Sequence, residues 1–172
     1  MVIATRSGRI CRILQGTLRR IPQKVRLAIE AFVGRVRCGR EWGTYAFGRM
    51  VDGRAAALFP RAPTAGGAKW QAELVLYLPV CRFFSDQAVT GVLAHVFAHA
   101  VRAASLGEGW WRILGDQWKR EERKADLLAT RWGFAPELRA RTQERARVLF
   151  PRIEERERHI VTSIARRVSA RS

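Results

Sequence analysis

Two histidines lie four residues apart in the segment His95-Val96-Phe97-Ala98-His99. Four residues make little more than one turn of an α-helix, so both imidazoles point to one side and can bind one metal ion. In the motif H-E-x-x-H, the glutamate after the first histidine is the general base that takes a proton from the water activated by the metal. Here that position is Val96, which cannot accept a proton. The segment therefore predicts a metal site more firmly than a peptidase.

Two carboxylates follow at the same spacing in the segment Glu122-Arg123-Lys124-Ala125-Asp126. On a helix they share one face, and an inward-facing pair of acids in such a basic chain needs a compensating charge. A zinc ion bound by His95, His99 and Glu122 supplies that charge and leaves a fourth ligand position open. Asp126 would accept a hydrogen bond from the second ring nitrogen of a ligand histidine and fix its orientation. We therefore predict these four residues as the metal site.

Glu121 and Glu108 are the nearby carboxylates that could replace the missing base. Glu121 projects about 100° away from Glu122 on a helix, which argues against it. Glu108 lies in a Gly-rich connection and could approach the metal. A positioned acid or base contributes about 10²–10⁴ in rate, so we expect an inactive or strongly impaired enzyme. Val96 then marks a pseudo-peptidase, an inactivated copy of an active relative, or a purely structural zinc site.

At these residues the chain resembles the gluzincin metallopeptidases, and in particular small bacterial and phage peptidase-like proteins. Their pattern LAHELAHA is similar to Leu93–Ala100, and their pattern E-x-x-A-D-x-x-A-x-x-W-G-F is similar to Glu122–Phe134. The resemblance covers about Leu74–Phe134, with a strand before the metal helix. It implies a zincin-like fold and, in active relatives, peptide-bond hydrolysis. The residues that it implies for zinc are His95, His99 and Glu122, with Asp126 behind them and Val96 in place of the catalytic glutamate.

Two helices are predicted to position these residues. Ser85 or Asp86 caps a helix that is apolar around most of its surface and carries both histidines. A second helix, roughly residues 117–132, carries the carboxylates and ends at Gly133. The sequence from Pro136 onward also predicts helix. The metal site is therefore expected between two helices that pack against each other.

The N-terminal half is predicted to supply a small sheet. Residues 73–78 (ELVLYL) are the best strand candidate, and Asp52-Gly53 between two short runs predicts a hairpin. A helix is expected from Pro22 to a close at residues 34–39, and a loop at residues 60–67. We expect residues 1–20 to form a basic N-terminal segment and residues 21–172 a single zincin-like domain. The predicted fold class is α+β: a small N-terminal sheet packed on a buried metal-binding helix, a second ligand helix and a helical C-terminus.

The composition leaves two function classes open. The 172 residues are 48% hydrophobic, enough for a core, and the net charge of +17 comes almost wholly from 28 Arg against 4 Lys. This charge can reflect either binding to a polyanion or cations scattered over a solvated surface. Because the positive residues are spread along the whole chain, we favour the scattered surface cations. Trp110-Trp111-Arg112 and Trp118-Lys119-Arg120 either bind single-stranded nucleic acid or roof the metal cleft. The first hypothesis is thus a zinc peptidase-like protein with a polypeptide substrate or protein partner, and the alternative is a basic nucleic-acid-associated module with a structural or vestigial metal site.

Cysteine use and hydropathy bear on the compartment. The three cysteines are far apart and predict no disulfide framework, which favours a reducing, cytoplasmic setting. The longest apolar run, around residues 74–84, is broken by Pro79 and Arg82, so no membrane span is expected. The first 29 residues hold no acid, which suits a basic tail or a transit peptide. His159, among several glutamates, is expected to be solvated rather than a ligand.

Overall fold

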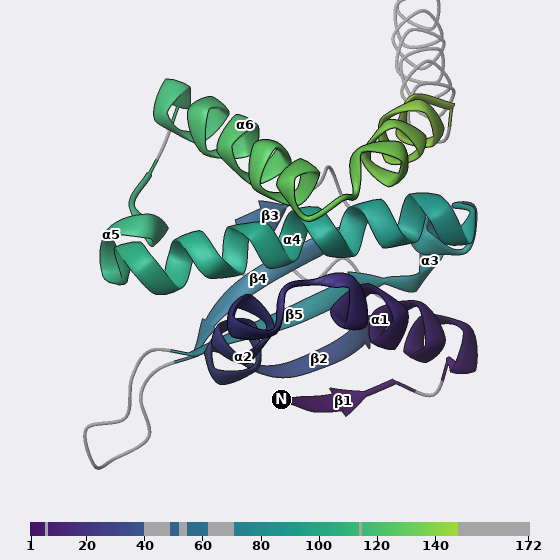
Figure 1. Ribbon diagram of the computed structural model, residues 1–172, viewed down its shortest axis with the longest axis horizontal. Coiled ribbons are helices and arrows are strands. Elements are labelled where there is room, and N and C mark those ends of the chain that lie inside the picture. The colour runs from purple at the N-terminus through teal and green to yellow at the C-terminus, as the bar shows by residue number, and fades with distance from the viewer. Residues whose placement is uncertain (6, 40–48, 52–54, 62–70, 114, 148–172) are drawn as a thin grey trace, which may run out of the picture.

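The computed structural model describes residues 1–5, 7–39, 49–51, 55–61, 71–113 and 115–147. In these residues the chain is α+β: one mixed sheet carries helices against one face, and two further helices pack above the longest of them (Figure 1). The strands are β1 (Val2–Ala4), β2 (Val33–Gly39), β3 (Arg49–Val51), β4 (Ala56–Arg61) and β5 (Gln71–Tyr77). The helices are α1 (Gly8–Arg20), α2 (Gln23–Phe32), α3 (Leu78–Cys81), α4 (Asp86–Leu106), α5 (Glu108–Trp111) and α6 (Gly115–Arg131), followed by a helix over residues 135–147.

The sheet has the strand order β1-β2-β5-β4-β3, with β1, β2 and β5 parallel and β4 and β3 antiparallel to their neighbours. Alternation along β5 places Leu74 and Leu76 toward the helices, whereas Val75 and Tyr77 pack with Ala57 on the other face. The predicted strand at residues 73–78 is confirmed as β5, and the predicted hairpin as the antiparallel pair β3–β4. The Asp-Gly turn of that hairpin lies outside the described residues.

The N-terminal third differs from the prediction. Residues 1–20, expected as a separate basic segment, form β1 and α1 and belong to the core, because Ile10, Leu14 and Leu18 recur on one face of α1 and are buried. Residues 34–39 do not close a helix but form β2. Val33 and Val36 of this strand are buried, and β5 supplies its hydrogen bonds. Strand β4 also extends through residues 60 and 61, which were expected to begin a loop.

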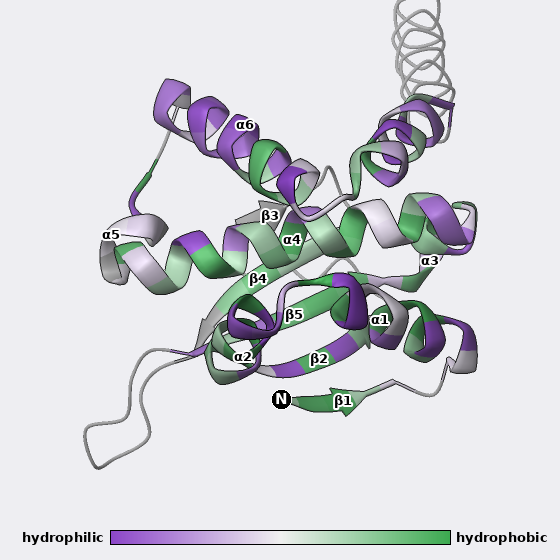
Figure 2. Ribbon diagram, viewed as in Figure 1, coloured by the Kyte–Doolittle hydropathy of each residue, from purple (hydrophilic) through white to green (hydrophobic). Residues whose placement is uncertain are grey.

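Helix α4 is the centre of the molecule. Every residue from 91 to 100 is buried, and hydrophobic residues line much of its length (Figure 2). Among the described helices it alone has the length and hydropathy of a membrane span, and 67% of that stretch is buried, as in the core helix of a globular protein. Its N-cap is Ser85, one of the two residues predicted for this position, and the Ser85 hydroxyl accepts a hydrogen bond from the Ala88 amide. The Glu144 carboxylate accepts hydrogen bonds from the Ser85 amide (2.7 Å) and hydroxyl (2.5 Å), which fixes the 135–147 helix to this end of α4.

Small residues let the other helices approach α4 closely. A Cβ on Gly91 would lie 2.2 Å from the Glu137 carbonyl oxygen, so the 135–147 helix crosses α4 at a distance that only glycine permits. Ala125 and Ala129 of α6 are likewise buried in the core. Helix α6 ends near Gly133, at the predicted C-cap, with φ of 88°. The backbone of α6 is thereby brought to the middle of α4, where the histidines lie.

Candidate metal centre

The predicted pair of histidines and the predicted pair of carboxylates meet where α6 packs on α4. The Nε2 atoms of His95 and His99 are 3.1 Å apart. Glu122 faces both, with Oε1 3.0 Å from His99 Nε2 and Oε2 3.4 Å from His95 Nε2. The predicted ligands are thus brought together, and each offers a donor atom to a common point. His95, His99 and Glu122 could hold a metal ion.

The spacing of these three donors fits one small divalent ion. Bonds of about 2.0–2.1 Å to nitrogen and oxygen, arranged as a tetrahedron, place the ligand atoms about 3.3 Å apart. The distance between the two Nε2 atoms, 3.1 Å, and the distances from His99 Nε2 to Oε1 (3.0 Å) and from His95 Nε2 to Oε2 (3.4 Å) of Glu122 lie close to that value. A single divalent cation could therefore bridge these donors.

Asp126 fixes the ring of His95 from behind. Its Oδ1 lies 2.7 Å from His95 Nδ1, and its carboxylate also contacts Arg141 Nη2 at 3.1 Å. Burial raises the pKa of Asp126, but the hydrogen bond from His95 and the charge of Arg141 outweigh it and hold the pKa below its ordinary 3.8. The carboxylate is therefore an acceptor and His95 Nδ1 carries the proton, which leaves His95 Nε2 as the ring nitrogen that can bind a metal at the centre. This is the role predicted for Asp126.

Burial and hydrogen bonds shift the pKa values of His99 and Glu122 toward the protonation states that bind a metal. Both histidines are completely buried, and desolvation lowers the pKa of His99, which favours its neutral, ligating form. Burial raises the pKa of Glu122, yet hydrogen bonds with His95 and His99 outweigh this and hold it far below its ordinary 4.5. The Glu122 side chain keeps 30% of its surface exposed. The centre therefore combines a His99 imidazole that favours its neutral form with one carboxylate that stays ionised.

Two tryptophans close the site around His99. The ring of Trp118 stacks on that of His99 with centroids 5.2 Å apart, and Trp110 meets the His99 ring edge-on at 5.9 Å. Trp110 is completely buried, which agrees with a roof over the cleft rather than with a surface for stacking bases. His99 Nδ1 is buried and has no hydrogen-bond partner among the described residues. Among the described residues, the polar contacts of the His99 ring are therefore those of Nε2 with His95 and Glu122.

None of the described carboxylates around the centre is free to act as a base. Val96 is completely buried in the apolar core. Glu121 points away from the histidines, as predicted, and accepts hydrogen bonds from Arg102 and Lys124. The hydrogen bond from Arg102 lowers the pKa of Glu121, opposed by burial and reinforced by Lys124. The side chain of Glu108, the other predicted substitute, lies outside the described residues, as does His159.

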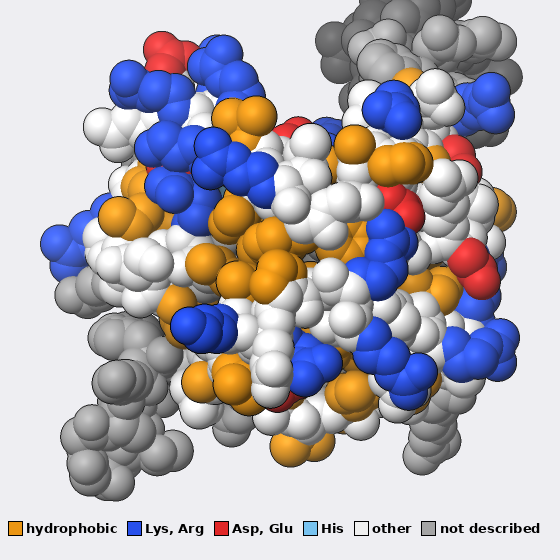
Figure 3. Space-filling view, viewed as in Figure 1, with side chains coloured by type: hydrophobic (Ala, Val, Ile, Leu, Met, Phe, Trp, Pro, Cys, Tyr) orange, Lys and Arg blue, Asp and Glu red, His pale blue; other side chains and the backbone are white. Residues whose placement is uncertain are grey.

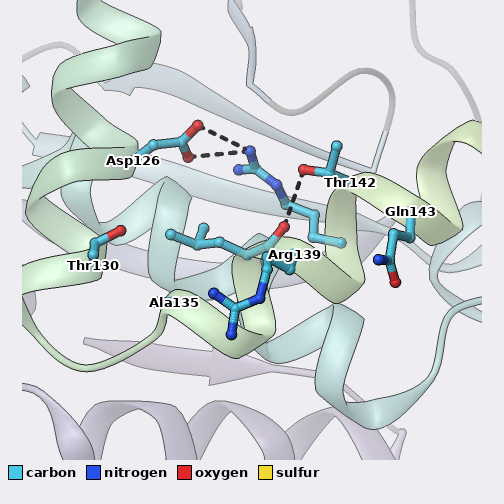
Figure 4. A pocket seen from close by; sticks show the side chains of 8 residues that line it. Asp126, Thr130, Ala135, Arg139, Thr142 and Gln143 are labelled. Atoms are coloured by element: carbon cyan, nitrogen blue, oxygen red, sulfur yellow. Dashed lines mark hydrogen bonds and ion pairs between the residues drawn. The ribbon is translucent and has the colours of Figure 1, made fainter.

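Arg141 was not among the predicted site residues. It comes from the 135–147 helix, is only 6% exposed, and reaches Asp126 across a pocket of about 520 Å³ between that helix and α6 (Figure 4). Arg139, Thr142 and Gln143 line the same pocket. Arg141 is one of 28 arginines with no distinguishing motif, and among the arginines whose burial the structure describes it is the one that is buried. No sequence signal points to it.

Comparison with known protein families, with curated protein sequences and with solved structures gave no match to this chain.

Proposed function

We propose that this protein binds one zinc ion through His95, His99 and Glu122 in a zincin-like site and has little or no peptidase activity. The observation that supports this most directly is that the two Nε2 atoms lie 3.1 Å apart and each lies 3.0–3.4 Å from one oxygen of the Glu122 carboxylate. Borderline ligands of nitrogen and oxygen suit zinc. When bound, zinc would act as a Lewis acid at the exposed side of the centre, where Glu122 reaches solvent.

The proposed loss of activity rests on what surrounds the donors. Peptide hydrolysis at such a centre needs a residue that accepts and returns a proton, and Val96 offers an apolar surface in that place. Asp126 is engaged by His95 and Arg141, and Glu121 by Arg102 and Lys124. The tryptophan roof and the buried histidines also suit a metal that joins α4 to α6. The function that the geometry supports best is therefore that of a pseudo-peptidase with a structural metal.

The metal content of the purified chain tests the first half of the proposal. We expect about one zinc per chain by elemental analysis after dialysis against metal-free buffer. His99→Gln and Glu122→Gln should each lower this content strongly, whereas Glu30→Gln, at a partly exposed glutamate on α2, should not. An equal loss in all three variants, or a wild-type protein that takes up no divalent metal when offered zinc, would contradict the proposed site.

The second half is tested by restoring the base. Val96→Glu in the zinc-loaded protein is expected to produce measurable cleavage of a denatured protein substrate, with a gain of about 10²–10⁴ over wild type if the base alone is missing. Val96→Gln is the matched control, because its amide has nearly the same shape but cannot take up the proton. Equal activity in the two variants, with zinc bound in both, would show that loss of the base does not explain the inactivity.

A further inference from the structure

A cluster of cations lies on α6 and on the adjoining end of α4. We define the α6 basic face as Lys119, Arg120, Arg123 and Lys124 of α6 together with Arg102 of α4. Figure 3 shows Lys and Arg side chains gathered over α6. Lys119 and Lys124 are 76% and 53% exposed, and Arg120 and Arg123 are also exposed. The face therefore presents its charge to solvent rather than to the core.

The charge of this face is only partly balanced. Glu121 takes the charge of Arg102 and Lys124, and Asp116 pairs with Lys119 at 3.0 Å. Arg120 and Arg123 form no ion pair with any described residue. Because they are three residues apart on a helix, their side chains are neighbours on one side of α6. Two guanidinium groups thus stand side by side without a counterion in the described part of the chain.

A concave site adjoins these arginines. A cavity of about 310 Å³ lies between the C-terminal end of α4 and α6, and three cations line it: Arg102, Arg120 and Lys124. The Gln117 amide adds a hydrogen-bond donor, and Leu106 and Ile113 complete the wall. The Glu121 carboxylate, 6% exposed, also lines the cavity and pairs with Arg102 and Lys124, so the three cations and this one anion carry a net charge of +2. A tetrahedral anion with several acceptor oxygens fits this arrangement of fixed donors.

We propose that the α6 basic face binds the phosphate backbone of nucleic acid, with one phosphate in the cavity between Arg102, Arg120 and Lys124. Guanidinium groups recognise phosphate with two parallel hydrogen bonds, and release of condensed counterions drives such binding. Recognition is independent of sequence, because the described part of this face carries cations but no exposed aromatic ring for base stacking. This activity is separate from metal binding.

Binding of a short labelled DNA duplex, followed by fluorescence anisotropy over a series of salt concentrations, tests this proposal. We expect the wild-type affinity to fall steeply with salt. The double variant Arg120→Gln/Arg123→Gln should lower the slope of log K against log salt by about 2, since each lost phosphate contact removes about 0.9. Its zinc content should remain that of the wild type, so failure here is distinguishable from failure of the metal site.

The matched control removes the same charge elsewhere. Arg12→Gln/Arg19→Gln changes two exposed arginines on α1 and should leave the slope unchanged. An equal effect of both double variants would overturn the proposal, since binding would then follow net charge rather than this face. A poly-glutamate peptide that binds as tightly as the duplex, with the same dependence on Arg120 and Arg123, would overturn the assignment to nucleic acid.

Discussion

Asp126 connects three helices through one carboxylate. It accepts a hydrogen bond from His95 of α4, belongs to α6, and pairs with Arg141 of the 135–147 helix. The two contacts of Asp126 support each other. Arg141 helps to keep the carboxylate ionised, and the ionised carboxylate orients the His95 imidazole. A residue that touches no metal can therefore set the affinity of the site.

Asp126→Asn should weaken zinc binding about 10–100-fold without abolishing it. The amide keeps the size of the side chain but no longer carries the charge that fixes His95 and balances Arg141. The Kd for zinc, measured by competition with a chromogenic chelator, checks this. Asp116→Asn is the control, because it makes the same change of charge on α6 at a position that is 85% exposed. Equal affinities for the two variants would show that Asp126 does not act through His95.

Residue spacing was sufficient to predict the four side chains that converge, but not Arg141. His95/His99 and Glu122/Asp126 each repeat at one helical turn, and this periodicity survives in any packing of the two helices. Arg141 reaches the site only because a separate helix folds over α4, and that arrangement depends on Gly91, 50 residues earlier. Contacts set by tertiary packing leave no local pattern.

At the scale of elements, the packing of helices around α4 controls the geometry of the centre. The 135–147 helix is held at one end by Glu144 on the N-cap of α4. Near its start, Arg20 of α1 contacts Glu137 at 2.5 Å and lies over the ring of Phe134. Between these two fixed ends, Gly91 allows the backbones to touch. The position of Arg141 follows from these three contacts.

Gly91→Ala should destabilise the protein by about 3 kcal/mol, the upper end of the usual cost of overpacking. A methyl group would lie 2.2 Å from a backbone carbonyl, and a backbone cannot rotate aside as a side chain can. Urea unfolding followed by circular dichroism measures the change. Gly16→Ala in α1 is the control: nothing lies within 4 Å of its added Cβ, so the helix should gain about 0.5–1 kcal/mol. A tolerated Gly91→Ala would mean that the two helices do not cross as closely as described.

The difference between local sequence patterns and contacts set by tertiary packing also explains which helices and strands could be predicted. Helices α4 and α6 and strand β5 carry strong apolar patterns or clear caps, so their type follows from local sequence. Strand β2 has the sequence VGRVRCG, with two glycines and two arginines that argue against a strand. It forms because β1 and β5 pair with it on both sides and because Glu73 of β5 contacts Arg35 and Arg37. Helix α1 has a regular apolar face, but its many arginines led to the prediction of a basic segment instead of a core helix.

At the scale of the whole molecule, the candidate metal centre lies between a large apolar core and a helix that buries little apolar surface. The sheet, α1, α2 and α4 share one continuous core. Helix α6 is largely charged and contributes few large apolar groups, and its buried residues are Ala125, Ala129 and Glu121. A helix that buries so little apolar surface gains little stability from packing. A bound ion that joins Glu122 to both histidines would therefore add a large share of the energy that holds α6 in place.

Removal of the metal should accordingly lower the melting temperature of the whole chain. A ligand at 100 times its Kd stabilises the folded state by about 2.7 kcal/mol, which for a chain of this size corresponds to about 5–11 °C. Calorimetry with and without excess chelator, at constant pH and salt, gives the shift. Glu122→Gln should melt near the temperature of the chelated wild type and respond little to chelator, because the site is already broken. If wild type binds zinc yet melts at the same temperature with chelator, the ion does not join α6 to the core, and a structural role for the metal is excluded.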